Sequence, residues 1–265
     1  MIGEHLQFHT ISNCFIHPSQ LGGLKSRSTM DARVALTHII CSGWVKNLTM
    51  STLAFDIAQL FPSLNHQLLP LILDKAGLDH KVSTFFRNYL VGRKTKYLWN
   101  EFTSPSFNVN VGVGQGSALS PILSVLYLSP IFLSLENCLK ILKIPISIIS
   151  FVDDGLFIFQ NKSILHSNTN LFCCYNIISS LLTKCGLIVK HGKTDVFHFS
   201  RSHGAFNPPP LDLSSFGGLV LLPKDTWRYL GFIFNCKLTF RNHIDFYTNK
   251  AISTAKCMKL LGNLT

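Results

Sequence analysis

The chain has 265 residues, of which 47% are hydrophobic and 14% are charged, with 24 lysines and arginines against 13 aspartates and glutamates. The hydrophobic content excludes a disordered chain, and the length is enough for one large core or one and a half domains. The formal net charge of +11 suits a partner with a phosphate backbone, and it equally suits an anionic membrane surface. Composition therefore predicts a basic globular protein and leaves its partner open.

The cysteines and the N-terminal residues indicate an intracellular chain. None of the eight cysteines belongs to a Cys-x-x-Cys pair or a Cys/His metal-ligand spacing, and Cys173 and Cys174 are adjacent. Met1 to Thr10 carries Glu4 and two histidines in place of the apolar core of a secretory signal. We therefore expect free thiols in a reducing compartment.

Helical and strand patterns alternate along the chain. Apolar periodicity and turn residues predict helices at 33–46, 66–75, 80–91, 120–137 and about 163–185, and a terminal helix from about 240. The strand signals predict a strand at 52–57, hairpins at 94–111, around Asp153-Asp154 and at 227–236, and a strand pair at 187–199. Residues 202–218 are rich in proline, glycine and serine and are typical of a loop insertion. This alternation predicts an α+β fold, with helices packed on one side of an antiparallel sheet.

Two apolar stretches, 119–135 and 139–152, are the segments that favour a membrane interpretation. Prolines interrupt the first stretch and Lys143 interrupts the second, so neither is a clean run of about 20 apolar residues. A buried helix and a central strand explain them better, and we expect no membrane partner.

Asp56 is a lone acid in the segment 51–66, where it follows apolar residues that are typical of a buried strand. Taken alone, it is equally well explained as the N-cap of a helix that follows the strand. Further along, Gly112 to Pro121 contains three glycines and a Gln-Gly-Ser turn. Glycines let the backbone approach a ligand, although many such loops only turn the chain. Ser120 and Pro121 predict the N-cap and first residue of a helix.

The adjacent acids Asp153 and Asp154 lie inside an apolar, aromatic run, Ser150 to Phe159. Burying one ionised carboxylate costs several kcal/mol unless it is compensated, so two require a counter-ion. Mg²⁺ is the counter-ion that carboxylates and phosphates hold together. A solvated Asp-Asp-Gly turn is the alternative. With Asp56 on a second strand, the three acids predict a two-metal site for phosphate chemistry.

In their order, these segments resemble the reverse transcriptase domain of non-LTR (LINE-type) retrotransposons, especially those of fungi. Six ordered matches are more specific than any single motif. The matching segments are His17-Pro18-Ser19-Gln20 to Asp31, Phe55-Asp56-Ile57 to Phe61, Gly112 to Pro121, Phe151-Val152-Asp153-Asp154, Gly186 to Asp195, and Trp227-Arg228-Tyr229-Leu230-Gly231-Phe232.

The resemblance implies a polymerase palm, which is a ferredoxin-like antiparallel sheet packed on helices, with partial fingers and the start of a thumb. It implies three regions: 1–50 as residual fingers or connection, 51–236 as palm, and 237–265 as the start of the thumb or a connecting helix. It also implies an RNA template, a DNA primer, deoxynucleoside triphosphates and a nuclear location.

The resemblance also assigns roles to residues. Asp56, Asp153 and Asp154 hold Mg²⁺ or Mn²⁺, and Lys193 neutralises or protonates the leaving pyrophosphate. Phe61 closes against the sugar, although it is equally well explained as a core residue. For Lys193, an ordinary exposed lysine is the more frequent explanation. The remaining assignments are nucleotide or template contacts by Lys25, Arg27, Gln115, Gly116 and Ser117, and a primer grip formed by Tyr229, Leu230 and Gly231.

The chain departs from the family in two places. The fingers motifs have no counterpart before Met1, and the family's Pro-Gln-Gly is Gly114-Gln115-Gly116 here. We therefore expect an N-terminally truncated reverse transcriptase, with the acids of the polymerase intact. The alternative is an inactive remnant that still binds nucleic acid.

Overall fold

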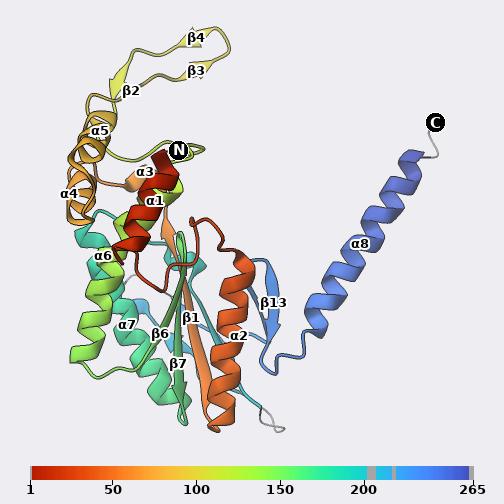
Figure 1. Ribbon diagram of the computed structural model, residues 1–265. Coiled ribbons are helices and arrows are strands. Elements are labelled where there is room, and N and C mark those ends of the chain that lie inside the picture. The colour runs from red at the N-terminus through yellow and green to blue at the C-terminus, as the bar shows by residue number, and fades with distance from the viewer. Residues whose placement is uncertain (1, 202–206, 217–218, 263–265) are drawn as a thin grey trace.

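A five-stranded antiparallel sheet forms the centre of the protein in a computed structural model that describes residues 2–201, 207–216 and 219–262 (Figure 1). The order across the sheet starts with β6 (Ser147–Phe151), β7 (Asp154–Asn161) and β1 (Thr49–Ala58). The other edge of β1 pairs with both β8 (Ile188–Val189) and β9 (Asp195–Phe199). The predicted strand pair at 187–199 is therefore wrong in its pairing, because a 3-10 turn, η1 (His191–Lys193), interrupts one edge strand.

Apolar residues cover both faces of this sheet. On β1, Leu53, Phe55 and Ile57 belong to one core cluster, whereas Met50 belongs to a second cluster. The same alternation continues on β7, where Phe157 and Phe159 belong to the first cluster and Leu156 and Ile158 belong to the second. A strand that is apolar on both faces needs cover on both sides.

Different elements provide the two covers. The helices α6 (Ser120–Ile141) and α7 (Ile164–Lys184) pack on the face of the first cluster. The other face is covered by α2 (Thr29–Val45) and by the hairpin of β12 (Thr226–Tyr229) and β13 (Phe232–Asn235). The prediction that helices pack on one side only is therefore wrong, and the unbroken apolar run at 156–159 is the physical reason.

α2 begins four residues earlier than the predicted helix at 33–46 because of a capping box. The Ser28 hydroxyl accepts a hydrogen bond from the Asp31 N–H, and the Asp31 carboxylate accepts one from the Ser28 N–H at 2.6 Å. This exchange satisfies N–H groups that a helix start otherwise leaves unpaired.

The remaining elements surround the sheet. Two short helices, α1 and α3, are not among the predicted elements, and of the predicted insertion at 202–218 only 207–216 lies within the described residues. The bounds are α1 (Ile2–Ser12), α3 (Leu60–Ser63), α4 (Leu68–Lys75), α5 (His80–Leu90), β2 (Lys94–Thr95), β3 (Leu98–Trp99), β4 (Phe102–Thr103), β5 (Phe107–Asn108), β10 (Leu211–Asp212), η2 (Ser214–Phe216), β11 (Val220–Leu221) and α8 (Arg241–Gly262).

Among the described residues, α6 is the one helix with the length and hydropathy of a membrane span. Its most apolar window is 67% buried inside the protein, where it contacts α4 and α7. That degree of burial agrees with the core helix expected from the sequence.

Gly155 is required by the packing of the first core cluster. It lies directly opposite Phe55 in the pairing of β1 with β7, and a Cβ atom there would overlap the Phe55 ring. We expect Gly155→Ala to lower the free energy of unfolding by about 1–3 kcal/mol in urea denaturation followed by circular dichroism. The matched control is Gly192→Ala, since a Cβ at Gly192 meets no atom within 4 Å. Equal losses in the two variants would contradict the packing argument.

Candidate active site

Asp56 and Asp154 lie directly opposite each other near one end of the sheet. They are the last pair in the register of β1 with β7, and opposite residues of an antiparallel pair point to the same face. Asp153 lies in the turn between β6 and β7, where its carbonyl accepts a hydrogen bond from the Ile57 N–H at 3.0 Å. Two strands and one turn therefore bring the three acids together.

Burial and neighbouring charge change the protonation of two of these carboxylates, Asp153 and Asp154. Burial, followed by the charge of Asp56, raises the pKa of Asp153 above its ordinary value. Burial, followed by the charges of Asp153 and Asp56, raises the pKa of Asp154 to about 6. The site therefore concentrates negative charge in partly buried positions and favours a cation.

Lys193 supplies one positive charge to this group. Its ammonium Nζ lies 2.8 Å from Oδ2 of Asp56, whose side chain is 8% exposed. The hydrogen bond with Asp56 is the main reason that the pKa of Lys193 is raised. The backbone fixes this position, because the Lys190 N–H donates to the Asp56 carbonyl at 2.7 Å and η1 follows at once. Lys193 is thus a partner of the acids as well as an exposed lysine.

Gln20 holds the turn that carries Asp153, and the sequence motifs did not assign it a role. Val152 has a φ of +58°, which is strained for a β-branched residue. The buried Gln20 side chain accepts a hydrogen bond from the Val152 N–H at 3.1 Å. Gly22 lies so close that a Cβ there would be 2.6 Å from the Val152 nitrogen. A signal for Gln20 was present only in the family-like segment that begins at His17.

The hairpin of β12 and β13 brings Tyr229 toward the acids. Tyr229 is 4% exposed, and burial together with the Asp154 charge raises the pKa of its hydroxyl. Leu230 and Gly231 form the two-residue turn, with φ values of 46° and 80°. From α8, the Tyr247 hydroxyl donates to the Gly231 carbonyl at 2.8 Å. The hairpin is therefore held by the burial of Tyr229 near the acids and by the hydrogen bond from Tyr247 of α8.

Comparison with known protein families identifies the family of this chain. The family model described as reverse transcriptase (RNA-dependent DNA polymerase) matches residues 2–234. The chain belongs to the reverse transcriptase family. A curated relative, the retrovirus-related Pol polyprotein from type-1 retrotransposable element R2 of Popillia japonica, is 24% identical over 237 residues. That match covers 83% of this chain and 31% of the relative, and it supports the resemblance to non-LTR retrotransposons.

Telomerases are among the solved structures with a similar fold. Telomerase from Candida tropicalis with a fragment of telomeric RNA has a TM-score of 0.65 at 16% identity, over 90% of this chain and 36% of that one. The apo form gives 0.63 at 17%, over 90% and 39%, and Candida albicans telomerase with a telomeric RNA fragment gives 0.56 at 14%, over 90% and 38%. The chain thus has the reverse transcriptase palm fold and spans roughly a third of these relatives.

The loop that carries Gln115 is hydrogen-bonded to the segment after Asp56. Gly112 has a φ of +85°, and its N–H donates to the Leu64 carbonyl at 2.7 Å, while the Val113 N–H donates to the Phe61 carbonyl at 2.8 Å. Gln115 and Gly116 are exposed at the tip of the loop, and Ser117 is half-buried. The loop therefore presents its predicted template residues to solvent.

The N-cap predicted at Ser120 is wrong. Ser120 is the first residue of α6, and its hydroxyl donates to the Gly114 carbonyl at 2.7 Å. Leu119 occupies the cap position and makes no side-chain cap bond. The serine is used to close the loop instead of capping the helix.

Three other predicted residues have contacts away from the acids. Phe61 is half-buried against the first core cluster, which supports its explanation as core and leaves its contact with the sugar a prediction. Lys25 pairs with Glu4 of α1 at 3.3 Å in an exposed position. Arg27 donates to the Gln20 carbonyl at 2.7 Å, so it supports the residue that holds the Val152 turn.

The donors at the site suit a hard divalent cation. Three neighbouring carboxylates in buried or partly buried positions would be stabilised by a cation bound among them, and oxygen is the ligand that Mg²⁺ prefers. Across the described residues, however, no group of three or more His, Cys, Asp or Glu side chains is already gathered as a metal site. Asp56 is oriented toward Lys193 instead.

Replacing Gln20 should loosen the Val152 turn. In Gln20→Ala the partly buried Val152 N–H loses its acceptor, which costs about 1–3 kcal/mol of unfolding free energy. We expect faster amide hydrogen exchange over 150–155 than in the exposed control Gln67→Ala. If exchange at the turn is the same in both variants, Gln20 does not hold it.

The raised pKa of Asp154 predicts a pH-dependent stability. An unfolded aspartate has a pKa of about 3.9, so the folded protein holds this proton more tightly and loses stability as the pH rises from about 4 to 6. Without divalent cations, Asp154→Asn should be more stable than the wild type at pH 7.5, by on the order of 1–2 kcal/mol after screening, and similar to it near pH 4. Denaturant titrations at both pH values measure this difference. The exposed control Asp225→Asn should show no such gain, and a gain that is independent of pH would refute the assignment.

Proposed function

We propose that this chain provides the polymerase site of RNA-directed DNA synthesis, in which a nucleotide is transferred to a primer 3′-hydroxyl. The observation that carries the proposal is the register of Asp56 opposite Asp154, with Asp153 in the adjoining turn and Lys193 on Asp56. Family membership supports the reaction class, and the site chemistry supports these residues as the ones that act.

Asp56, Asp153 and Asp154 are the residues that would hold the divalent cations. When bound, such ions activate the attacking hydroxyl and stabilise the phosphates of the leaving pyrophosphate. Asp56 can turn to a cation only if its ion pair with Lys193 opens. Lys193 is then free to face the leaving pyrophosphate, and because an ordinary lysine is protonated at neutral pH, its ammonium can act as a proton donor there.

The partners of the proposed reaction are an RNA template, a DNA primer and deoxynucleoside triphosphates. The net charge of +11 supports binding to phosphate backbones. Gln115, Gly116 and Ser117 would contact the template and the nascent pair, and the exposed tip of their loop leaves room for them. Tyr229, Leu230 and Gly231 would hold the primer end beside the acids. A nuclear location follows if chromosomal DNA supplies the primer.

Primer extension tests the polymerase proposal. The full chain should extend a DNA primer on an RNA template with Mg²⁺, and Asp153→Asn should reduce the rate by at least about 100-fold. Asp225→Asn, an exposed acid on the segment leading into β12, is the matched control and should extend as the wild type does. Equal extension by wild type and Asp153→Asn would overturn the proposal.

A second measurement is independent of turnover. Mg²⁺ should raise the melting temperature of the wild type at pH 8, because a cation relieves the repulsion among the acids, and should raise that of Asp153→Asn much less. Salt-sensitive RNA binding with neither extension nor this stabilisation would identify the chain as an inactive binding remnant.

A further inference from the structure

Residues 91–111 form an arm that projects from the body of the protein. Figure 1 shows the arm, which carries β2 to β5, beyond α5 at the end of the molecule where β1 leads into α3. Its base is the pairing of β2 with β5, and its tip is the pairing of β3 with β4. The arm lies in the chain between Asp56 and the Gln115 loop.

One side of the arm carries four exposed aromatic rings. Trp99 lies directly opposite Phe102 across the tip, so both point to the same face. Toward the base, the rings of Tyr97 and Phe107 are 5.1 Å apart. Their exposed fractions are 76% for Trp99, 68% for Tyr97, 63% for Phe102 and 39% for Phe107. Soluble proteins rarely expose so much contiguous apolar area without a partner for it.

The charge of the arm indicates the chemistry of that partner. Residues 91–111 contain three basic residues, Arg93, Lys94 and Lys96, and one acidic residue, Glu101. In the part of the chain that the structure describes, neither Lys94 nor Lys96 takes part in an ion pair. Aromatic rings and unpaired lysines on one hairpin are the combination that binds single strands, since bases stack on the rings while the lysines contact the phosphates that run along the hairpin.

The base of the arm is connected to the candidate site. The Arg93 guanidinium donates to the Gly112 carbonyl at 3.3 Å, and it lies 5.2 Å from the centre of the Tyr89 ring on α5. The Val109 N–H donates to the Arg93 carbonyl at 2.8 Å on the returning strand. The base of the arm is therefore joined to the start of the loop that carries Gln115, so a strand that follows the arm from tip to base is led toward that loop.

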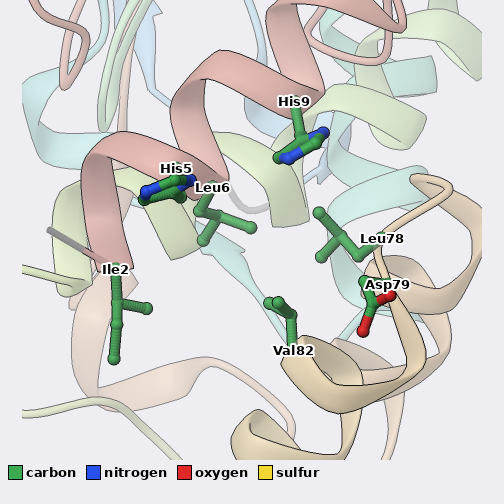
Figure 2. Close-up of a pocket in the computed structure, with 7 residues that line it drawn as sticks. All are labelled: Ile2, His5, Leu6, His9, Leu78, Asp79 and Val82. Carbon is green, nitrogen blue, oxygen red and sulfur yellow. The ribbon is translucent and has the colours of Figure 1, made fainter.

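The pocket between α1 and α5 gives weaker evidence for a binding site than the arm does. A pocket of about 260 Å³ lies between α1 and the start of α5. Figure 2 shows His5 and His9 on α1, with Asp79 on the other side of the pocket. The Asp79 carboxylate already caps α5 by accepting from the Lys81 N–H. No metal-ligating group of three is found there among the described residues, so the arm is the stronger candidate.

We propose that the arm binds single-stranded RNA, with bases stacked on Trp99, Phe102 and Tyr97 and phosphates contacting Lys94 and Lys96. This inference rests on the proposed function, because it takes the strand to be the template on its way to Gln115. The arm adds a second contact to a template that would otherwise be held only at the active site.

Tryptophan fluorescence reports on the arm directly. Of the three tryptophans, Trp227 is 3% exposed and Trp44 is half-buried, so Trp99 is the one open to stacking. Titration of the full chain with an oligouridine RNA should quench its fluorescence, and Trp99→Phe should abolish the quenching while retaining most of the affinity. Trp99→Ala should weaken binding by roughly 5- to 140-fold, as expected for the loss of one stacked base.

A matched control and a salt titration separate stacking from general loss of structure. Leu98→Ala is the control, since Leu98 is also 76% exposed but belongs to the opposite face of the same strand, and it should bind as the wild type does. Lys94→Gln with Lys96→Gln should reduce the slope of log affinity against log salt by about 1.4, from about 0.7 for each phosphate contact on a single strand.

Several results would overturn the inference. One such result is RNA binding that leaves the fluorescence of the wild type unquenched and has the same affinity in Trp99→Ala. It would show that the strand does not contact the arm, whatever the outcome of primer extension. A concentration-dependent dimer in sedimentation that Trp99→Ala abolishes would show that the rings contact a second copy of the chain instead. Loss of primer extension in Asp153→Asn with unchanged quenching would leave both proposals standing.

Discussion

Repulsion among Asp56, Asp153 and Asp154 is the constraint around which this domain is organised. Register places the first and last of them opposite each other, and the turn adds the third. Three negative charges in partly buried positions are unstable without compensation, as the raised pKa values of Asp153 and Asp154 indicate. In the structure Lys193 provides part of that compensation. The strained Val152 turn, held by Gln20, keeps Asp153 among the acids.

The two-sided sheet explains how the acids can lie where they do. α6 and α7 bury one face, and α2 with the β12–β13 hairpin buries the other. The acid face is thus closed at its edge by the hairpin of Tyr229, and burial is the main reason for the pKa shifts. Removing water from a polar site strengthens every charge interaction in it, which benefits ligand binding and costs stability when no ligand is present.

The sequence predicted the strongly patterned parts and missed those that depend on distant contacts. The strand of Asp56, the hairpin of Asp153 and the helices of the first core cluster follow from local periodicity and turn residues. The second cover of the sheet does not, because nothing local tells which elements will pack on a strand that is apolar on both faces. Gln20 acts across 132 residues of sequence, and Ser120 donates to a carbonyl where a cap was expected. The pairing of Gln20 is not encoded in any short segment, whereas that of Ser120 with Gly114 is local but depends on how the glycine loop folds back.

The position of β1 in the sheet has a consequence for synthesis of the chain. β1 is the central strand, yet its neighbours β7, β8 and β9 all follow it by about a hundred residues or more. While the ribosome is still making the helices between them, an apolar strand with two unpaired edges is available to any other strand it meets. Such non-local pairing also folds slowly. Production of this domain should therefore depend on chaperones, and on growth temperature, more than a helical protein of its size would.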